Sequence, residues 1–192
     1  MSDQLFIPLI LGTNRKDRKS EYAAKWVHSK IAEREDIETH YFDVRDFALP
    51  QDDYGTALGP QFPEWQGAMK RADGLVIVTP EYNHGYPGVL KSVLDLLLKE
   101  YIHKPVAFVG VSAGPWGGTR VVEAMLPMVR ELGFVSTFTD LNFPSIGSKF
   151  DEQGELLDTA YEKRVKGFLD ELTWMARTLK WGRENVASRH HQ

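Results

Sequence analysis

Short apolar runs alternate along the chain with segments whose apolar residues recur every three or four positions. Such runs are typical of strands buried on both faces, and the longer spacing is typical of helices that pack on one face. The expected strands are residues 6–11, 37–42, 75–78, 106–111 and a fifth within 134–141. The expected helices are residues 20–33, 63–71, 88–100, 118–132 and 156–180. Residues 43–62, rich in Asp, Gly and Pro, are expected to form a long loop.

Strands and helices alternate throughout, which predicts an α/β fold with a parallel sheet covered by helices on both faces. Five strands suit a three-layer flavodoxin-like fold with the strand order 2-1-3-4-5. We infer this order from the two most unusual turns, which follow the first and third strands. In this order those strands are neighbours, and ligands bind in the crevice between them. We expect one domain over residues 1–182 and a polar C-terminal tail over residues 183–192.

The bulk composition narrows the possible partners. The chain has 192 residues, a formal net charge of −4 and no cysteine. Mild charge of mixed sign gives no reason to expect nucleic acid or a membrane as a partner. The lack of cysteine excludes disulfides, thiol catalysis and cysteine-ligated metals. Residues 1–4 begin no signal-peptide pattern, and no apolar run approaches the ~20 residues of a membrane span. We therefore expect a cytoplasmic protein.

The turn between the first strand and the first helix combines the features of an anion site. Gly12 allows a sharp turn, Thr13 and Ser20 offer hydroxyl groups, and the helix start offers free backbone N–H groups. Formal positive charge comes from Arg15, Lys16, Arg18 and Lys19. These features predict a phosphate site. The alternative is an ordinary solvated loop in which Ser20 only caps the helix.

Two familiar nucleotide motifs are missing from the sequence. It contains no G-x-G-x-x-G, so the usual dinucleotide fingerprint is absent, and no G-x-x-x-x-G-K-[ST], so this is not a Walker-type loop. We therefore expect the phosphate to belong to a mononucleotide.

A second turn concentrates polar and aromatic residues after the third strand. It reads Thr79-Pro80-Glu81-Tyr82-Asn83-His84-Gly85-Tyr86-Pro87-Gly88-Val89-Leu90-Lys91. Together the two turns resemble the signatures of the NADPH-dependent FMN reductases, a flavodoxin-like family that includes quinone, azo-dye and chromate reductases. The family's G-S-x-R, then x-x-R-x-S, is similar to residues 12–20, and its P-E-Y-N-x-x-x-P-G-x-L-K-N-x-[IL]-D to residues 80–95. The departures are Thr13 for Ser and Ser92 for Asn.

The resemblance implies an enzyme that passes hydride from NADPH, or NADH, through bound FMN to a small-molecule acceptor by a ping-pong scheme. The acceptor would be a quinone, an azo compound, a metal ion or a flavin. Because the flavin N5 would carry the chemistry, we expect no catalytic side chain. His, Asp and Glu are scattered without H-x-x-x-H or similar ligand spacing, so we expect no metal. The expected cofactor-binding residues are Thr13, Arg15, Arg18, Ser20, Pro80, Glu81, Tyr82, Asn83, His84, Ser112, Gly114 and Gly117.

Some of these assignments have a physical basis besides the resemblance. Pro80 stiffens the exit from the strand, the backbone of residues 81–83 could lie along a flat ring, and the Asn83 amide can both donate and accept. For Pro80 by itself, ordinary turn chemistry is the better interpretation. For His84, a place on the surface competes with a place near the ring edge.

The turn after the fourth strand raises a rival function. Residues 110–114 match G-x-S-x-G, the nucleophile elbow of serine hydrolases, with Ser112 as the nucleophile. However, residues 115–118 delay the next helix, and a late triad histidine would have to be His190 or His191 in the tail. In a flavin site the same glycine-rich turn would let the backbone approach the ring opposite Tyr82. A non-enzymatic FMN electron carrier is the second alternative.

Two of the expected helices, near residues 89–98 and 121–132, are apolar on nearly all sides. Helices of this kind are buried, so we expect these two to meet another subunit. Leu97 is taken as an interface position, and burial beneath the loop of residues 43–62 is the alternative. The resemblance likewise implies a homodimer or homotetramer.

Overall fold

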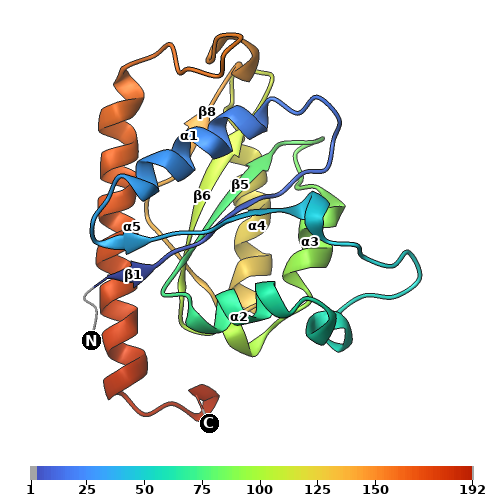
Figure 1. Ribbon diagram of the computed structural model, residues 1–192, viewed down its shortest axis with the longest axis vertical. Helices are drawn as coiled ribbons and strands as arrows, with labels where there is room; N and C mark the ends of the chain where they lie inside the picture. The colour runs from blue at the N-terminus through green and yellow to red at the C-terminus, as the bar shows by residue number, and fades with distance from the viewer. Residues whose placement is uncertain (1–3, 192) are drawn as a thin grey trace.

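The computed structural model describes residues 4–191 and forms three layers around a parallel sheet (Figure 1). Residues 1–3 and 192 lie outside the described part, and with them lie the expectations for the first residues and for the end of the tail. The main sheet has the order β4-β2-β5-β6-β7, with β8 also paired to β6. Its strands are β2 (Leu9–Leu11), β4 (Tyr41–Asp43), β5 (Leu75–Pro80), β6 (Pro105–Val111), β7 (Val135–Ser136) and β8 (Leu141–Phe143). A two-stranded sheet pairs β1 (Leu5–Phe6) with β3 (Ile37–Glu38).

The fold class is confirmed, but the strands are more numerous and shorter than expected. The first expected strand is divided into β1 and β2 around Pro8, which has no N–H to donate. The second is divided into β3 and β4. The fifth position is shared, because β7 pairs with the start of β6 and β8 pairs with its end. Within residues 4–191, eight short strands therefore occupy the five positions of the order 2-1-3-4-5.

In the described part of the chain, five α-helices cover the two faces of the sheet. They are α1 (Ser20–Ala32), α2 (Pro63–Arg71), α3 (Gly88–Leu94), α4 (Thr119–Glu131) and α5 (Ala160–Asn185). Helices α1 and α5 pack on one face, and α2, α3 and α4 pack on the other. None of the helices in the described part of the chain has the length and apolar character needed to cross a bilayer.

Two helix boundaries differ from the expectation. Helix α5 continues past Lys180 into the expected tail, because its last turns are anchored: Lys180 Nζ and Arg183 Nη2 both bond the Asp73 carboxylate, at 3.0 and 3.1 Å. Helix α3 ends at Leu94, well before residue 100. The chain then enters a 3-10 turn, η3 (Lys99–Tyr101).

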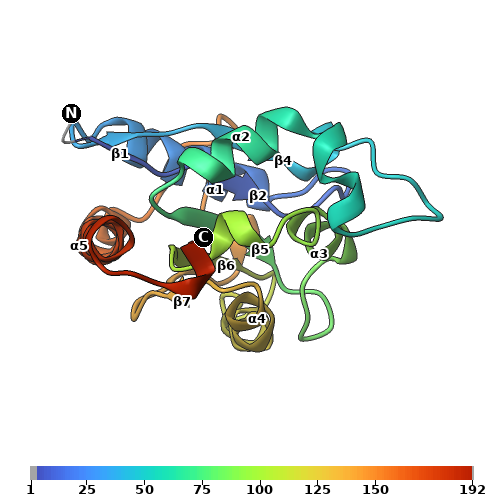
Figure 2. The same ribbon diagram turned by 90° about the horizontal axis from the view of Figure 1, so that it is seen from below.

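The long loop of residues 43–62 is partly ordered and covers α3. It contains two 3-10 turns, η1 (Val44–Asp46) and η2 (Thr56–Gln61), and Figure 2 shows it extending beside α3. Leu97 is only 3 % exposed and belongs to the same core as Leu58 of η2. The expectation that Leu97 faces another subunit is therefore wrong, and burial beneath the loop is the correct alternative.

Candidate functional site

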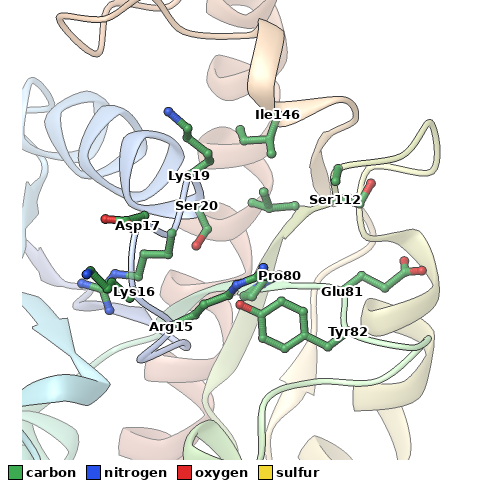
Figure 3. A pocket seen from close by; sticks show the side chains of 13 residues that line it. Arg15, Lys16, Asp17, Lys19, Ser20, Pro80, Glu81, Tyr82, Ser112 and Ile146 are labelled. Carbon is green, nitrogen blue, oxygen red and sulfur yellow. The ribbon is translucent and has the colours of Figure 1, made fainter.

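A cleft of about 410 Å³ lies at the carboxyl ends of β2, β5 and β6 (Figure 3). Its size is within the range of small-molecule sites, and its position is where open parallel sheets bind ligands. It is lined by Arg15, Lys16, Asp17, Arg18, Lys19, Ser20, Pro80, Glu81, Tyr82, Val111, Ser112, Ala113 and Ile146. The structure thus brings seven of the twelve predicted site residues to one cleft: Arg15, Arg18, Ser20, Pro80, Glu81, Tyr82 and Ser112.

The first turn supplies one wall of the cleft. A Cβ on Gly12 would lie 2.7 Å from Leu90 Cδ2, so a larger residue there would force the Leu90 side chain to shift. Thr13 does not line the cleft itself, but its hydroxyl bonds the Tyr82 hydroxyl at 3.0 Å and accepts from the Arg15 N–H at 3.3 Å. Thr13 therefore joins the first turn to the turn after β5.

Ser20, the first residue of α1, has a buried hydroxyl without a partner. The side chain lines the cleft, the residue is 3 % exposed, and Oγ has no hydrogen bond among the described residues. An unpaired buried hydroxyl costs free energy, so in native structures such groups usually meet a ligand or a water. At a helix N-terminus, where N–H groups and the helix dipole favour negative charge, the fitting partner is an anionic oxygen.

The basic side chains of this wall are not equivalent. Arg15, Lys16 and Lys19 are exposed, and the Arg15 guanidinium lies 5.8 Å from the centre of the Tyr82 ring. Arg18, by contrast, is buried. Its Nη1 bonds Asp43 Oδ1 at 2.7 Å, its Nη2 bonds Asp43 Oδ2, and its Nε lies 3.4 Å from Glu21. Burial by itself would lower the pKa of Arg18, but these carboxylates outweigh it and raise the pKa. The charge of Arg18 is therefore already balanced within the protein.

The turn after β5 forms the floor of the cleft. Tyr82 and Gly85 exchange two backbone hydrogen bonds, each of 2.9 Å. Between them Asn83 and His84 adopt left-handed conformations with φ of 51° and 66°, as in the tight turns of β-hairpins. These two exposed residues form the tip of the turn and do not line the cleft, unlike Pro80 and Tyr82.

Glu81 connects this floor to α4. Its side chain is 5 % exposed, and Oε1 lies 2.5 Å from Arg120 Nη2. In Figure 3 the carboxylate lies on the opposite side of the cleft from Lys16 and Lys19. The negative charge of Glu81 is thus kept apart from the basic wall.

The turn after β6 completes the site with backbone and small side chains. Ser112 Oγ donates to the Gly114 carbonyl at 2.8 Å. Among the described side chains no histidine bonds Ser112; the side chain of His191 lies outside the description. Gly114 and Gly117 do not line the cleft. Gly117 instead packs close to Asn142, because a Cβ would lie 3.0 Å from Asn142 Cβ.

Sequence reasoning missed Ile146, which closes the cleft from a 3-10 turn, η4 (Ile146–Ser148), that follows β8. Its N–H donates to the Ser112 carbonyl at 3.0 Å. The only sequence signal for Ile146 was its position, because the turn after the fifth strand also lies at the carboxyl edge of the sheet, where ligands bind. The finished cleft has a basic wall with an unpaired hydroxyl and an apolar floor and side formed by Pro80, Tyr82 and Ile146. It suits a flat, largely apolar ligand with one anionic end.

Comparison with known proteins gives consistent results. A family model described as NADPH-dependent FMN reductase matches residues 7–145. A 2-hydroxy-1,4-benzoquinone reductase from Burkholderia sp is 30% identical over 180 residues, covering 86% of this chain and 93% of that protein. An NAD(P)H-dependent FMN reductase from Nectria sp is 35% identical over 126 residues, or 59% of this chain, and the match spans only 62% of the relative.

A solved structure shares the fold. The flavoenzyme NAD(P)H:(acceptor) oxidoreductase FerB from Paracoccus denitrificans superposes with a TM-score of 0.74 at 24% identity. The superposition covers 91% of this chain and 98% of FerB. The flavodoxin-like architecture inferred from the strand order is thus found in a known flavoenzyme.

Proposed function

Since this chain belongs to the NADPH-dependent FMN reductase family, we propose that it is an FMN-dependent NAD(P)H oxidoreductase. It takes hydride from NADPH, or NADH, and delivers electrons to a small-molecule acceptor of the quinone, azo, metal-ion or flavin class. The quinone and azo classes are supported by relatives named as a benzoquinone reductase and as azoreductases.

The observation that carries this proposal is the unpaired Ser20 hydroxyl at the start of α1, at the basic end of the cleft. A phosphate monoester carries close to two negative charges at neutral pH. The Ser20 hydroxyl and backbone N–H at the start of α1, together with the exposed Arg15, would hold it. The residues present therefore fit the phosphate of FMN, and riboflavin would leave the same groups unpaired.

The rest of the cleft would bind and orient the flavin ring. Pro80, Tyr82 and Ile146 offer apolar surface, and the Thr13–Tyr82 hydrogen bond holds the phosphate wall and the ring floor at a fixed spacing. When bound, the flavin would supply the redox chemistry, accepting hydride from a nicotinamide nucleotide and passing electrons to an acceptor. Asn83 and His84, at the exposed tip, would meet only a ligand that extends beyond the cleft.

Two measurements test the proposal. Protein reconstituted with flavin should release FMN on heating, and mass spectrometry that finds FAD or no flavin would contradict the cofactor assignment. The loaded protein should then be mixed anaerobically with NADPH or NADH in a stopped-flow instrument, and separately with a quinone. A ping-pong enzyme is reduced by the nicotinamide alone and gives parallel double-reciprocal plots in the steady state. A carrier would not be reduced by the nicotinamide at a rate that supports turnover.

A further inference from the structure

Three successive carbonyl groups of the first turn are held by two arginine side chains. Arg18 Nη1 donates to the Thr13 carbonyl. Arg45 donates from Nε to the Asn14 carbonyl at 3.4 Å and from Nη2 to the Arg15 carbonyl. A carbonyl oxygen turned toward a bound anion would repel it. Here two positive side chains hold the oxygen atoms of all three.

Fixing these carbonyls also fixes the donors that follow them. In a trans peptide the C=O of one residue and the N–H of the next point in opposite directions. Bonds to the carbonyls of Thr13, Asn14 and Arg15 therefore set the direction of the N–H groups of residues 14, 15 and 16. The Arg15 N–H already donates to the Thr13 hydroxyl, so the donors left for a phosphate are those of residues 14 and 16. Backbone N–H groups in such turns are what phosphate groups bind. Arg18 and Arg45 thus hold the backbone of the first turn in one conformation, which fixes the direction of its N–H groups.

Both arginines depend on one carboxylate, that of Asp43. It receives both terminal nitrogens of Arg18, and it accepts from the Arg45 backbone N–H at 3.0 Å, which caps η1. The Arg18 and Asp43 side chains are 3% and 15% exposed, so the pair is shielded from solvent. Asp43 is the last residue of β4 and is in register with Leu11 of β2, just before the turn. The sheet therefore places Asp43 directly beside the turn that it supports.

We propose that Asp43, acting through Arg18 and Arg45, is a positioning residue that shapes the first turn for phosphate and thereby determines the preference for FMN over riboflavin. This inference rests on the proposed function. We call Asp43, Arg18 and Arg45 together the brace. Arg18, expected from the sequence to bind the phosphate, acts instead as part of this brace. The brace also gives the start of the long loop a role, because Asp43 and Arg45 belong to residues 43–62.

The test compares the dissociation constants of FMN and riboflavin, measured by flavin fluorescence on the apoprotein. Asp43→Asn keeps the size of the side chain and removes its charge. We expect FMN binding to weaken about tenfold, the effect of losing about one charge-assisted hydrogen bond, and riboflavin binding to stay within about twofold. Arg45→Ala, at an exposed position, should weaken FMN binding about three- to tenfold. Arg45→Lys, which keeps the positive charge but has a single donor nitrogen, should fall between Arg45→Ala and wild type.

The matched control is Asp36→Asn. Asp36 also holds an arginine by two bonds, to Arg34 Nε at 2.8 Å and Nη2 at 3.1 Å. It precedes β3, however, whereas Asp43 ends β4, so Asp36 lies at the far end of this segment from the first turn. This variant should leave the ratio of FMN to riboflavin affinity unchanged, even where the melting temperature falls.

The outcomes separate the two proposals. Wild-type protein that binds FMN no better than riboflavin overturns the proposed phosphate site and the brace with it. Wild-type protein that prefers FMN, with the same ratio in Asp43→Asn and Arg45→Ala, overturns the brace alone. Equal weakening of both ligands also overturns the brace, because that is the effect of a general loss of structure. If Asp43→Asn does not fold, the Arg45 variants decide.

Discussion

At the scale of single residues, partners decide what a charged side chain can do. Arg15 and Arg18 lie three positions apart and look alike in the sequence. Arg15 is exposed and close to Tyr82, whereas Arg18 is buried against Asp43. Only Arg15 keeps its guanidinium available to a ligand. The sequence signature alone could not separate these roles, because Asp43 lies 25 residues away from Arg18.

Arg15→Ala should weaken FMN binding about ten- to a hundredfold, because a hydrogen bond between charged groups contributes about 1.5–3 kcal/mol. Riboflavin has no phosphate, so its dissociation constant should not change. Fluorescence titration of the apoprotein measures both values, and excess FMN should restore turnover. Unchanged FMN binding, or an equal loss for riboflavin, would show that Arg15 does not meet the phosphate.

Ser20→Ala should have opposite effects on the free and the bound protein. Without ligand the hydroxyl is buried and unpaired, so its removal should leave the free energy of unfolding unchanged or slightly raised. With FMN the variant loses a bond to the phosphate, so binding should weaken about tenfold. Urea unfolding and flavin titration measure the two effects. A clear loss of stability in the apoprotein would mean that the hydroxyl has a partner within the protein.

At the scale of elements, the hydrophobic pattern predicted which segments are helices and strands, and the structure confirms the five helices and the order of the sheet. The internal structure of residues 43–62 was not predicted. Its turns are stabilised by residues distant in sequence, as Arg18 bonds Asp43 and Leu58 of η2 joins the same core as Leu97. A local pattern carries no information about such contacts. Leu97 was placed at an interface for the same reason.

The close packing of η2 against the segment after α3 can be tested by substituting alanine for two glycines, one in η2 and one in α2. A Cβ on Gly59 would lie 2.6 Å from the Leu96 carbonyl oxygen, whereas nothing lies within 4 Å of a Cβ on Gly67 in α2. Gly59→Ala should therefore destabilise the protein by about 1–3 kcal/mol. Gly67→Ala should stabilise it by up to about 1 kcal/mol, since alanine favours a helix. Urea denaturation gives both values, and equal stabilities would contradict the close packing.

At the scale of the whole molecule, a polar cluster at the opposite end of the sheet joins segments from across the chain. Asp73 accepts from the Phe6 N–H at 3.1 Å and binds Lys180 and Arg183 of α5. Lys104, which precedes β6, is 7% exposed, and its amine donates to the Met69 and Lys70 carbonyls at the end of α2. Burial, together with the nearby charge of Arg183, lowers the pKa of Lys104 to about 8.

This lowered pKa predicts a pH dependence of stability. Between about pH 8 and the ordinary lysine pKa near 10.4, the unfolded chain binds a proton at Lys104 that the folded protein does not. Stability therefore rises with pH in this window, and below it the full cost of burying the charge is present. Relative to Lys104→Met, the wild-type free energy of unfolding should rise by about 2–3 kcal/mol from pH 7.5 to 10.5. If urea denaturation shows that the difference in free energy of unfolding between wild type and Lys104→Met stays constant over this pH range, the prediction is wrong.

Assembly also belongs to this scale, and we propose a homodimer or homotetramer that uses the exposed sides of α3 and α4. Leu98, just after α3, is 45% exposed and replaces Leu97 as the position to test. Leu98→Glu should preserve the fold and shift the protein toward monomer in light scattering, whereas Leu97→Glu should unfold it. Wild-type protein that is already monomeric at micromolar concentration would refute the proposal.

The brace also couples ligand binding at the first turn to the edge of the sheet, because Asp43 belongs to β4. Strand β4 forms one edge of the main sheet, and within the described residues it pairs only with β2. Edge strands open locally at a lower free energy than central ones. If β4 opens, Asp43 leaves the turn and the phosphate site is lost with it. Flavin binding should therefore also stabilise β4 against local opening, and so make this edge less available for edge-to-edge aggregation.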